Sequence, residues 1–163
     1  MPGFLGRWWV LVLVVLLSAC AQPPRAPQAI DHDRNAWDGR LALRIASDPP
    51  QSFFAGFELR GNARTGDLSL LSPLGSILGR LEWSPGDALL RWNGESRRFA
   101  SIEALTREAT GTELPIASLF HWLAGEQTRS DGWDADLSGL SDGKIVARRS
   151  TPAPAVEMRL VFE

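Results

Sequence analysis

Several residue types are scarce in the 163-residue sequence, which has one cysteine, one lysine, two histidines and no tyrosine. A lone cysteine excludes an internal disulfide, and the two histidines have no second ligand at the spacing of a metal site. The basic residues form no run and the net charge is −2, so the positive surface that binds nucleic acid is missing. We therefore expect no metal and no nucleic-acid partner.

Motifs of catalysis and nucleotide binding are absent as well. There is no Gly-rich phosphate loop, and no serine or cysteine nucleophile in a recognisable setting. His121 falls in a predicted helix and is interpreted as a surface residue. Asp134 and Asp136 alternate with apolar residues, which is typical of the solvated face of a strand rather than of a catalytic pair. We expect a protein that is not an enzyme and that uses no cofactor.

The first twenty residues predict a secretion signal. Arg7 gives it a positive start, and Trp8 to Leu17 is apolar throughout. Ten residues are too few to span a bilayer, which takes about 20, but they fit the core of a signal peptide. The next residues, up to Ala19-Cys20, complete a match to the bacterial lipobox. This resemblance implies that residues 1–19 are removed and that Cys20 is acylated, whereas the alternative is an ordinary cysteine near an ordinary cleavage site.

The mature chain is predicted to be one domain on a tether. Residues 20–36 combine the lipidated Cys20 with a segment containing Pro23, Pro24 and Pro27, a composition typical of an extended linker. Ala21, where an aspartate favours retention in the inner membrane, favours the outer membrane. Residues 37–163 are enough for a single domain with its own core.

Most of this domain alternates between apolar and polar residues with a period of two. Such alternation predicts half-buried antiparallel strands, and the turn sequences between the segments, among them Ser84-Pro85-Gly86-Asp87 and Asn93-Gly94, support it. The residues expected on the buried face are Leu41, Leu43, Ile45, Phe53, Ala55, Phe57, Leu59, Ile77, Leu81, Trp83, Ala88, Leu90, Trp92, Val156, Met158, Leu160 and Phe162.

Two helices are predicted to interrupt the strands. Ser101 is a plausible N-cap for a helix to about Thr110, and Gly111 is its stop signal. Pro115 suits the first position of a second helix, whose apolar stripe ends before Gly125. Both need a surface for their apolar faces, and the concave face of a curved sheet is available. A strongly curved sheet closed by helices leaves an interior that side chains need not fill.

Two segments resemble a known family. The first is the run from Gly66 to Ser76, which contains Ser72-Pro73-Leu74-Gly75. The second lies within residues 105–125, where its matching positions stand at fixed spacings: Thr110-Gly111, Leu114-Pro115-Ile116, Leu119, Trp122-Leu123 and Gly125. Together with the lipobox, these segments are similar to the outer-membrane lipoprotein receptor family (LolB).

The resemblance implies a mainly β fold with a helical insertion. The family has an incomplete, half-open antiparallel barrel, covered by a helical lid at about residues 101–124 over a hydrophobic cavity. The implied function is to accept acylated lipoproteins from a soluble periplasmic carrier (LolA-like) and to insert them into the inner leaflet of the outer membrane. The implied partners are thus the carrier, the lipoprotein cargo and outer-membrane lipids, and we expect a monomer anchored in the outer membrane and facing the periplasm.

The resemblance also assigns roles to individual residues. Membrane delivery is expected from the loop with Pro73, Leu74 and Gly75, where a rigid turn leaves Leu74 at the tip; the alternative is a leucine folded back under the loop. The residues expected in the lid and cavity are Leu105, Pro115, Ile116, Leu119, Phe120, Trp122 and Leu123.

Two departures and several alternatives accompany this hypothesis. The segment from Ala29 to Trp37 is short for the family's N-terminal helix. The region after Arg149, interrupted by Pro152 and Pro154, is short for as many strands as in longer members. Closure of the cavity is therefore not decided by the sequence, although its existence is still expected. The main alternative is a non-transporting outer-membrane scaffold lipoprotein, or a binder of lipids or other hydrophobic ligands on the same fold. The soluble carrier itself is disfavoured by the lipobox, and a lipid hydrolase by the missing nucleophile.

Overall fold

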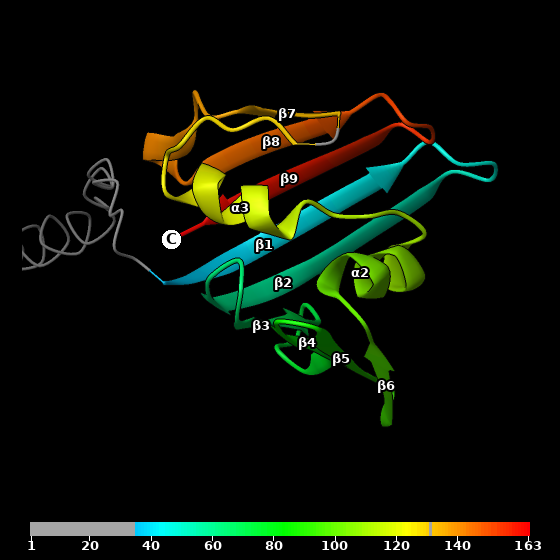
Figure 1. Cartoon of the computed structure of the whole chain (residues 1–163). Helices are drawn as coiled ribbons and strands as arrows, with labels where there is room; N and C mark the ends of the chain where they lie inside the picture. Colours follow the sequence, from blue (N-terminus) through cyan, green and yellow to red (C-terminus); the bar gives the residue numbers. More distant parts are fainter. Residues whose placement is uncertain (1–34, 131) are drawn as a thin grey trace, which may run out of the picture.

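The computed structural model describes residues 35–130 and 132–163, so the predicted signal, Cys20 and most of the tether lie outside the described residues. The described part folds into one antiparallel sheet with two α-helices (Figure 1). Its strands are β1 (Ala36–Ile45), β2 (Gln51–Gly61), β3 (Gly66–Leu71), β4 (Ile77–Ser84), β5 (Asp87–Trp92), β6 (Glu95–Phe99), β7 (Trp133–Asp136), β8 (Lys144–Arg149) and β9 (Val156–Phe162).

The sheet is a meander with one long-range pairing. Its strand order is β6-β5-β4-β3-β2-β1-β9-β8-β7, so β1 pairs with both β2 and the C-terminal β9. Within the described residues β6 and β7 are edge strands that do not pair with each other, and the sheet is therefore curved but open. The prediction of a mainly β fold with an unclosed antiparallel sheet is confirmed. The region after Arg149 has room for one further strand, β9, beyond its two prolines.

The predicted alternation of buried and exposed side chains is confirmed along most strands. On β2 the buried residues Ala55, Phe57 and Leu59 alternate with partly or fully exposed neighbours, and β9 behaves in the same way. We call the apolar face the inner face and its opposite the outer face. The chain turns between strands where the sequence predicts it: Pro85-Gly86 joins β4 to β5, and Asn93-Gly94 joins β5 to β6 with positive φ at both residues.

Ile77 is an exception to the predicted pattern. It was expected on the inner face with Leu81 and Trp83, yet its side chain is exposed. The cause is a register shift in the β3–β4 pairing: Leu70 pairs with Gly79, whereas the next residue, Leu71, pairs with Ile77. One extra residue on β4 reverses the side-chain direction beyond it, so Ile77 lies on the outer face.

Both predicted helices are present, with one small correction. Helix α2 (Ile102–Thr110) begins after Ser101, whose hydroxyl accepts a hydrogen bond from the backbone N–H of Ala104 at 3.2 Å, and it ends at Gly111 with φ of 73°. Helix α3 (Ile116–Leu123) begins one residue later than predicted, because Pro115 with ψ of 69° is its cap rather than its first residue. No helix among the described residues has the length and apolar character needed to cross a membrane.

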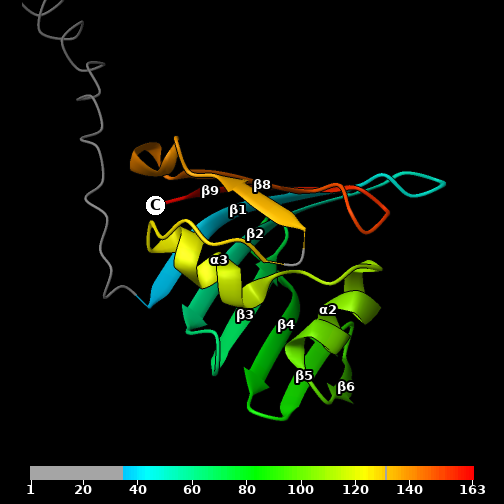
Figure 2. The same ribbon diagram turned by 45° about the horizontal axis from the view of Figure 1, so that its top comes forward.

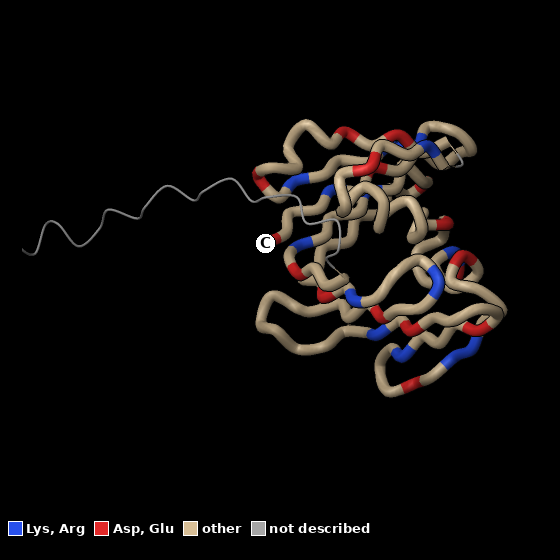
Figure 3. The backbone as a smooth tube through the Cα atoms, turned by 60° about the vertical axis from the view of Figure 1, so that its left-hand side comes forward, with Lys and Arg blue, Asp and Glu red and all other residues tan. Residues whose placement is uncertain are grey.

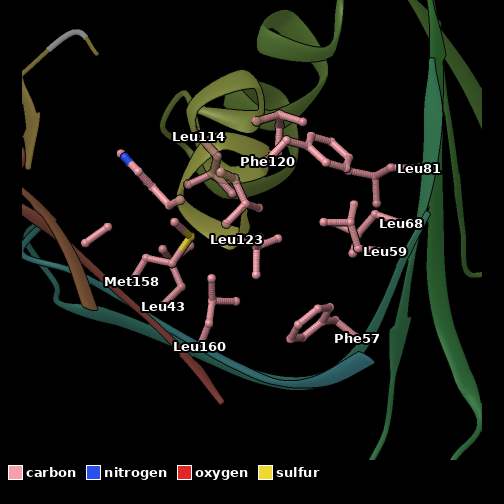
Figure 4. Close-up of a cluster of buried hydrophobic side chains, with 14 of the residues drawn as sticks. Leu43, Phe57, Leu59, Leu68, Leu81, Leu114, Phe120, Leu123, Met158 and Leu160 are labelled. Carbon is pink, nitrogen blue, oxygen red and sulfur yellow. The ribbon is translucent and has the colours of Figure 1, made fainter. Parts of the chain in front are cut away.

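The helices cover the inner face of the sheet. In Figures 1 and 2 both lie on the same side of the curved sheet, α3 across its middle strands and α2 near β5 and β6. Phe120 of α3 packs between Trp37 of β1 and Trp83 of β4, with ring centroids 5.6 and 6.2 Å apart. Figure 4 shows the helix side chains of Phe120 and Leu123 facing the leucines of the strands. The core thus lies between α3 and the sheet.

Candidate functional site

An apolar pocket lies beside this core, between the inner face of β1–β6 and the segment that contains α2. Its volume is about 500 Å³. The wall from the sheet is mainly aliphatic or aromatic, and α2 and the connection to α3 complete it. The apolar lining residues are Leu41, Leu43, Ile45, Phe53, Leu68, Leu70, Leu81, Leu90, Trp92, Ala109, Leu114 and Ile116.

Short side chains on α2 leave this space unfilled. Ala109 and Thr110 of the last helical turn line the pocket, and neither is long enough to reach the opposite strands. The nearby Thr106 is buried, and its hydroxyl accepts a hydrogen bond from the backbone N–H of Leu114 at 3.2 Å, which fixes the α2–α3 connection against α2. Across the pocket, Leu41 and Phe53 are only partly buried although they face inward. The pocket is therefore an apolar space between the sheet and α2 with its hydrogen-bonded connection to α3.

The polar lining residues come mainly from one end of the sheet. Because successive strands alternate in direction, the β1–β2 hairpin, the β3–β4 loop and the β5–β6 turn lie at the same end, which we call the mouth end. Gln51 and Ser52, at the start of β2, and Asn93, in the β5–β6 turn, line the pocket there. Arg97 of β6 and Glu108 of α2 also line it, and their ion pair at 2.9 Å joins the edge strand to the helix.

The predicted delivery loop lies at the mouth end between β3 and β4. The side chain of Leu74 is 93% exposed, which excludes a leucine folded back under the loop. The Ser72 hydroxyl accepts hydrogen bonds from the backbone N–H groups of Leu74 and Ser76, and the Gly75 N–H donates to the Ser72 carbonyl at 2.9 Å. Gly75 has a φ of 80°, a conformation that glycine adopts without strain. Local hydrogen bonds thus fix the loop while Leu74 projects into solvent beside the exposed Pro73.

The residues predicted for the lid and cavity divide between pocket and core. Of the seven, Ile116 alone lines the described pocket. Pro115 is half-buried at the start of α3. The remaining five belong to the hydrophobic core: Leu105, Leu119, Phe120, Trp122 and Leu123. Their part in ligand binding stays a prediction.

Sequence reasoning missed an arginine that holds the α2–α3 connection to the sheet. Arg149, at the end of β8, is only 7% exposed. Its Nη2 donates a hydrogen bond to the Thr112 hydroxyl at 2.6 Å, and its guanidinium carbon lies 5.6 Å from the centre of the Trp133 ring. The only signal in the sequence was an arginine at an inward position of a strand, opposite the apolar Val156.

Charges on the surface are mixed in sign. Figure 3 shows acidic and basic residues interspersed over the described chain. Hydrogen bonds from Arg159 and then Arg148 hold the pKa of Glu157 below its usual value, and hydrogen bonds from Ser138 lower the pKa of Asp136. His121 is exposed on α3, 2.6 Å from Glu126. Among residues 35–130 and 132–163, no group of three acidic, histidine or cysteine side chains is placed to hold a metal ion.

Comparisons with known proteins agree with each other. The family model described as "Outer membrane lipoprotein LolB" matches residues 34–148. A relative from Bordetella petrii named "Outer-membrane lipoprotein LolB" is 30% identical over 94% of this chain and 89% of its own length. Relatives of the same name from Bordetella pertussis and Dechloromonas aromatica are 28% and 33% identical, over 98% and 81% of this chain and 92% and 80% of theirs.

Proposed function

The chain belongs to the LolB family of outer-membrane lipoproteins, and we propose that it accepts acylated lipoproteins from a periplasmic carrier and inserts them into the inner leaflet of the outer membrane. It is an outer-membrane lipoprotein that faces the periplasm. Handing on an intact lipid-modified protein breaks no covalent bond, so the proposed role needs no catalytic group.

The apolar pocket is the observation that carries this proposal. Its volume of about 500 Å³ lies within the ~300–1,000 Å³ typical of small-molecule sites. Each CH₂ group that leaves water for such a wall gains ~0.8 kcal/mol, so an acyl chain is a ligand of matching chemistry. A bilayer offers nearly the same gain. Transfer onward is therefore close to thermodynamically neutral, and no energy source is required for release.

The helices supply the lid of the proposed site. Residues 101–124 include α2, α3 and their connection, which lie on the pocket side of the sheet (Figure 2). The Arg97–Glu108 ion pair is partly exposed and adds little stability, so the contact between lid and edge strand can open at small cost. The α3 side remains held by Phe120 in the aromatic core. We infer that the contact between α2 and β6 opens to admit cargo, while α3 and the connection, which Arg149 holds to the sheet through Thr112, stay in place.

The membrane anchor and the delivery loop are assigned to separate parts of the chain. We propose that residues 1–19 are a removed signal, that Cys20 carries the acyl anchor, and that residues 20–36 tether the domain 37–163 to the membrane. The loop of Pro73, Leu74 and Gly75 is proposed to bring the mouth end to the lipid surface. The exposure of Leu74 supports this role.

Binding of a fluorescent diacylated lipopeptide to the purified protein tests the pocket. Leu41→Gln introduces a polar group into its wall, whereas the neighbouring Ala42→Gln places the same group on the outer face of β1. We expect saturable binding that Leu41→Gln weakens and Ala42→Gln leaves unchanged, with the lipopeptide recovered chemically intact. Equal binding by both variants would show that the lipid binds elsewhere, and cleaved lipopeptide would favour a hydrolase.

A further inference from the structure

The outer face of the sheet carries ion pairs, and beside the β3–β4 loop it also carries two exposed apolar side chains. It carries ion pairs between neighbouring side chains, such as Glu58 with Arg60 at 3.6 Å, Glu82 with Arg91 and, at the mouth end of β8 and β9, Arg148 with Glu157 at 2.8 Å. On β2, β3 and β4 this pattern stops towards the mouth. Phe54 on β2 and Ile77 on β4 are 62% and 59% exposed. A single exposed apolar residue is ordinary, but a group of them in one place marks an interaction site.

The strand register places these side chains around the Leu74 loop. Gly56 of β2 pairs with Leu71 of β3, and Leu71 pairs with Ile77 of β4. Phe54 lies two residues before Gly56 on the same face, so it is a diagonal neighbour of Leu71 at a distance that a phenyl ring can span. The loop that carries Leu74 connects β3 and β4 at this point. Phe54 and Ile77 therefore flank Leu74 on the outer side of the mouth.

Trp92 adds an exposed apolar side chain at the mouth end, on the inner face of the sheet. It is 36% exposed at the end of β5 and lines the pocket itself. Its ring lies against Gly79 of β4, where an added Cβ would be only 2.2 Å from the ring. The missing side chain at Gly79 thus allows the indole to lie against the strand. Tryptophan is enriched where proteins meet the membrane–water interface.

We propose that Phe54, Leu74, Ile77 and Trp92 form one apolar rim that contacts the lipid surface, so that the pocket opens directly onto the bilayer. The inference rests on the proposed function. It extends the protein's contact with the membrane from Leu74 alone to four side chains, which come from β2, the β3–β4 loop, β4 and β5. Lipid is favoured over a protein partner because the segments that carry Phe54, Leu74 and Ile77 hold no charge: residues 51–57 and 68–79 contain no Asp, Glu, Lys or Arg, whereas Trp92 stands between Arg91 and Glu95 in the sequence. Such segments enter an apolar phase without burying an ion.

The length of the tether is compatible with this orientation. Strand β1 begins at the end of the sheet opposite the mouth and has ten residues, or ~33 Å at ~3.3 Å per residue. Fifteen residues separate Cys20 from Ala36, and they span at most ~50 Å when extended. The tether is therefore long enough for the mouth end to reach the membrane that holds the anchor.

Dye-labelled single-cysteine variants of the mature lipoprotein test the rim. We would introduce Phe54→Cys, Ile77→Cys and, as a matched control, Val161→Cys, and attach an environment-sensitive dye to each. Val161 is also an exposed apolar residue, 48% exposed, but it pairs with Arg40 and Lys144 at the opposite end of the sheet. Acylation leaves Cys20 without a free thiol, and the chain has no other cysteine. The proteins are reconstituted in vesicles of phosphatidylethanolamine and phosphatidylglycerol with quenchers on the acyl chains.

We expect blue-shifted emission and several-fold stronger quenching at positions 54 and 77 than at 161. Water-like emission at all three, or equal quenching at 161, overturns the rim, and so does a dye response to the carrier alone without vesicles. Cargo transfer by the unlabelled wild type is measured in parallel. Transfer without dye contact refutes the rim and leaves the function standing, whereas no transfer refutes the function itself. Thermal melts of Phe54→Ser and Ile77→Ser check that these exposed positions do not determine folding.

Discussion

Replacing Leu74 with glutamate tests whether this residue serves membrane delivery rather than folding. The Leu74 side chain is 93% exposed and fixed only through backbone hydrogen bonds to Ser72, so Leu74→Glu removes no packing. We expect its free energy of unfolding to stay within about 0.5 kcal/mol of wild type, as for other surface substitutions. Uptake of cargo from the carrier is also expected to be unchanged, because Leu74 does not line the pocket.

The Leu74→Glu substitution is expected to weaken the contact of the loop with the membrane. A leucine that enters the apolar phase gains ~1.5–3 kcal/mol, and a carboxylate there costs up to ~2.5–3.5 kcal/mol. At ~1.4 kcal/mol for each factor of ten, the inserted state of the loop becomes less populated by roughly a thousand-fold or more. Release of cargo from the loaded protein into liposomes should fail for Leu74→Glu and persist for Leu74→Ile and Leu74→Phe. A melting temperature lowered by many degrees, or normal release, would refute this reasoning.

Three further predictions concern the core, the α2–α3 connection and acid stability. Phe120→Ala should lower the free energy of unfolding by ~3–5 kcal/mol in urea titrations, since the ring packs between Trp37 and Trp83, whereas Ile116→Val at the pocket wall should cost only ~0.5–1.5 kcal/mol. Thr112→Val leaves Nη2 of the buried Arg149 without its hydroxyl acceptor and should cost about 1–3 kcal/mol, with Thr112→Ser close to wild type; equal melting of all three proteins contradicts the bond. The pKa of Glu157 is held below its usual 4.5 by Arg159 and Arg148, so its carboxylate stabilises the fold above that pH and the contribution is lost as the pH falls below it. Wild type should therefore lose more stability than Glu157→Gln when denaturant titrations are compared above and below pH 4.5, and parallel losses would show that the two arginines do not stabilise the charge.

The sequence predicted the strands because their periodicity directly reflects which side faces the core. Residues 55–59 alternate, and the structure buries Ala55, Phe57 and Leu59 but not Gly56 and Glu58. It failed at Ile77, since a one-residue bulge reverses the face without changing the local pattern. It indicated β6 only through the Asn93-Gly94 turn, because the residues of this edge strand are nearly all exposed and show no alternation.

The candidate site was predicted less completely than the fold. An apolar stripe such as Leu119 with Leu123 indicates burial, but it does not distinguish packing against another side chain from facing a void. In the structure these residues pack in the core, and the pocket is lined instead by Leu114, Ile116 and the short residues that end α2. Leu74 was easier to place, because proline and glycine on either side of it define a tip.

A two-step transfer assay tests the central claim most directly. Carrier loaded with a labelled lipoprotein is mixed with the purified protein, and vesicles are then added while the label is followed through each step. The account predicts that label moves from carrier to wild type and then to vesicles. Leu41→Gln should fail at the first step and Leu74→Glu at the second. Label that stays on the carrier in the presence of wild type, or that reaches vesicles equally well with Leu41→Gln, would contradict a lipoprotein receptor that works through this pocket.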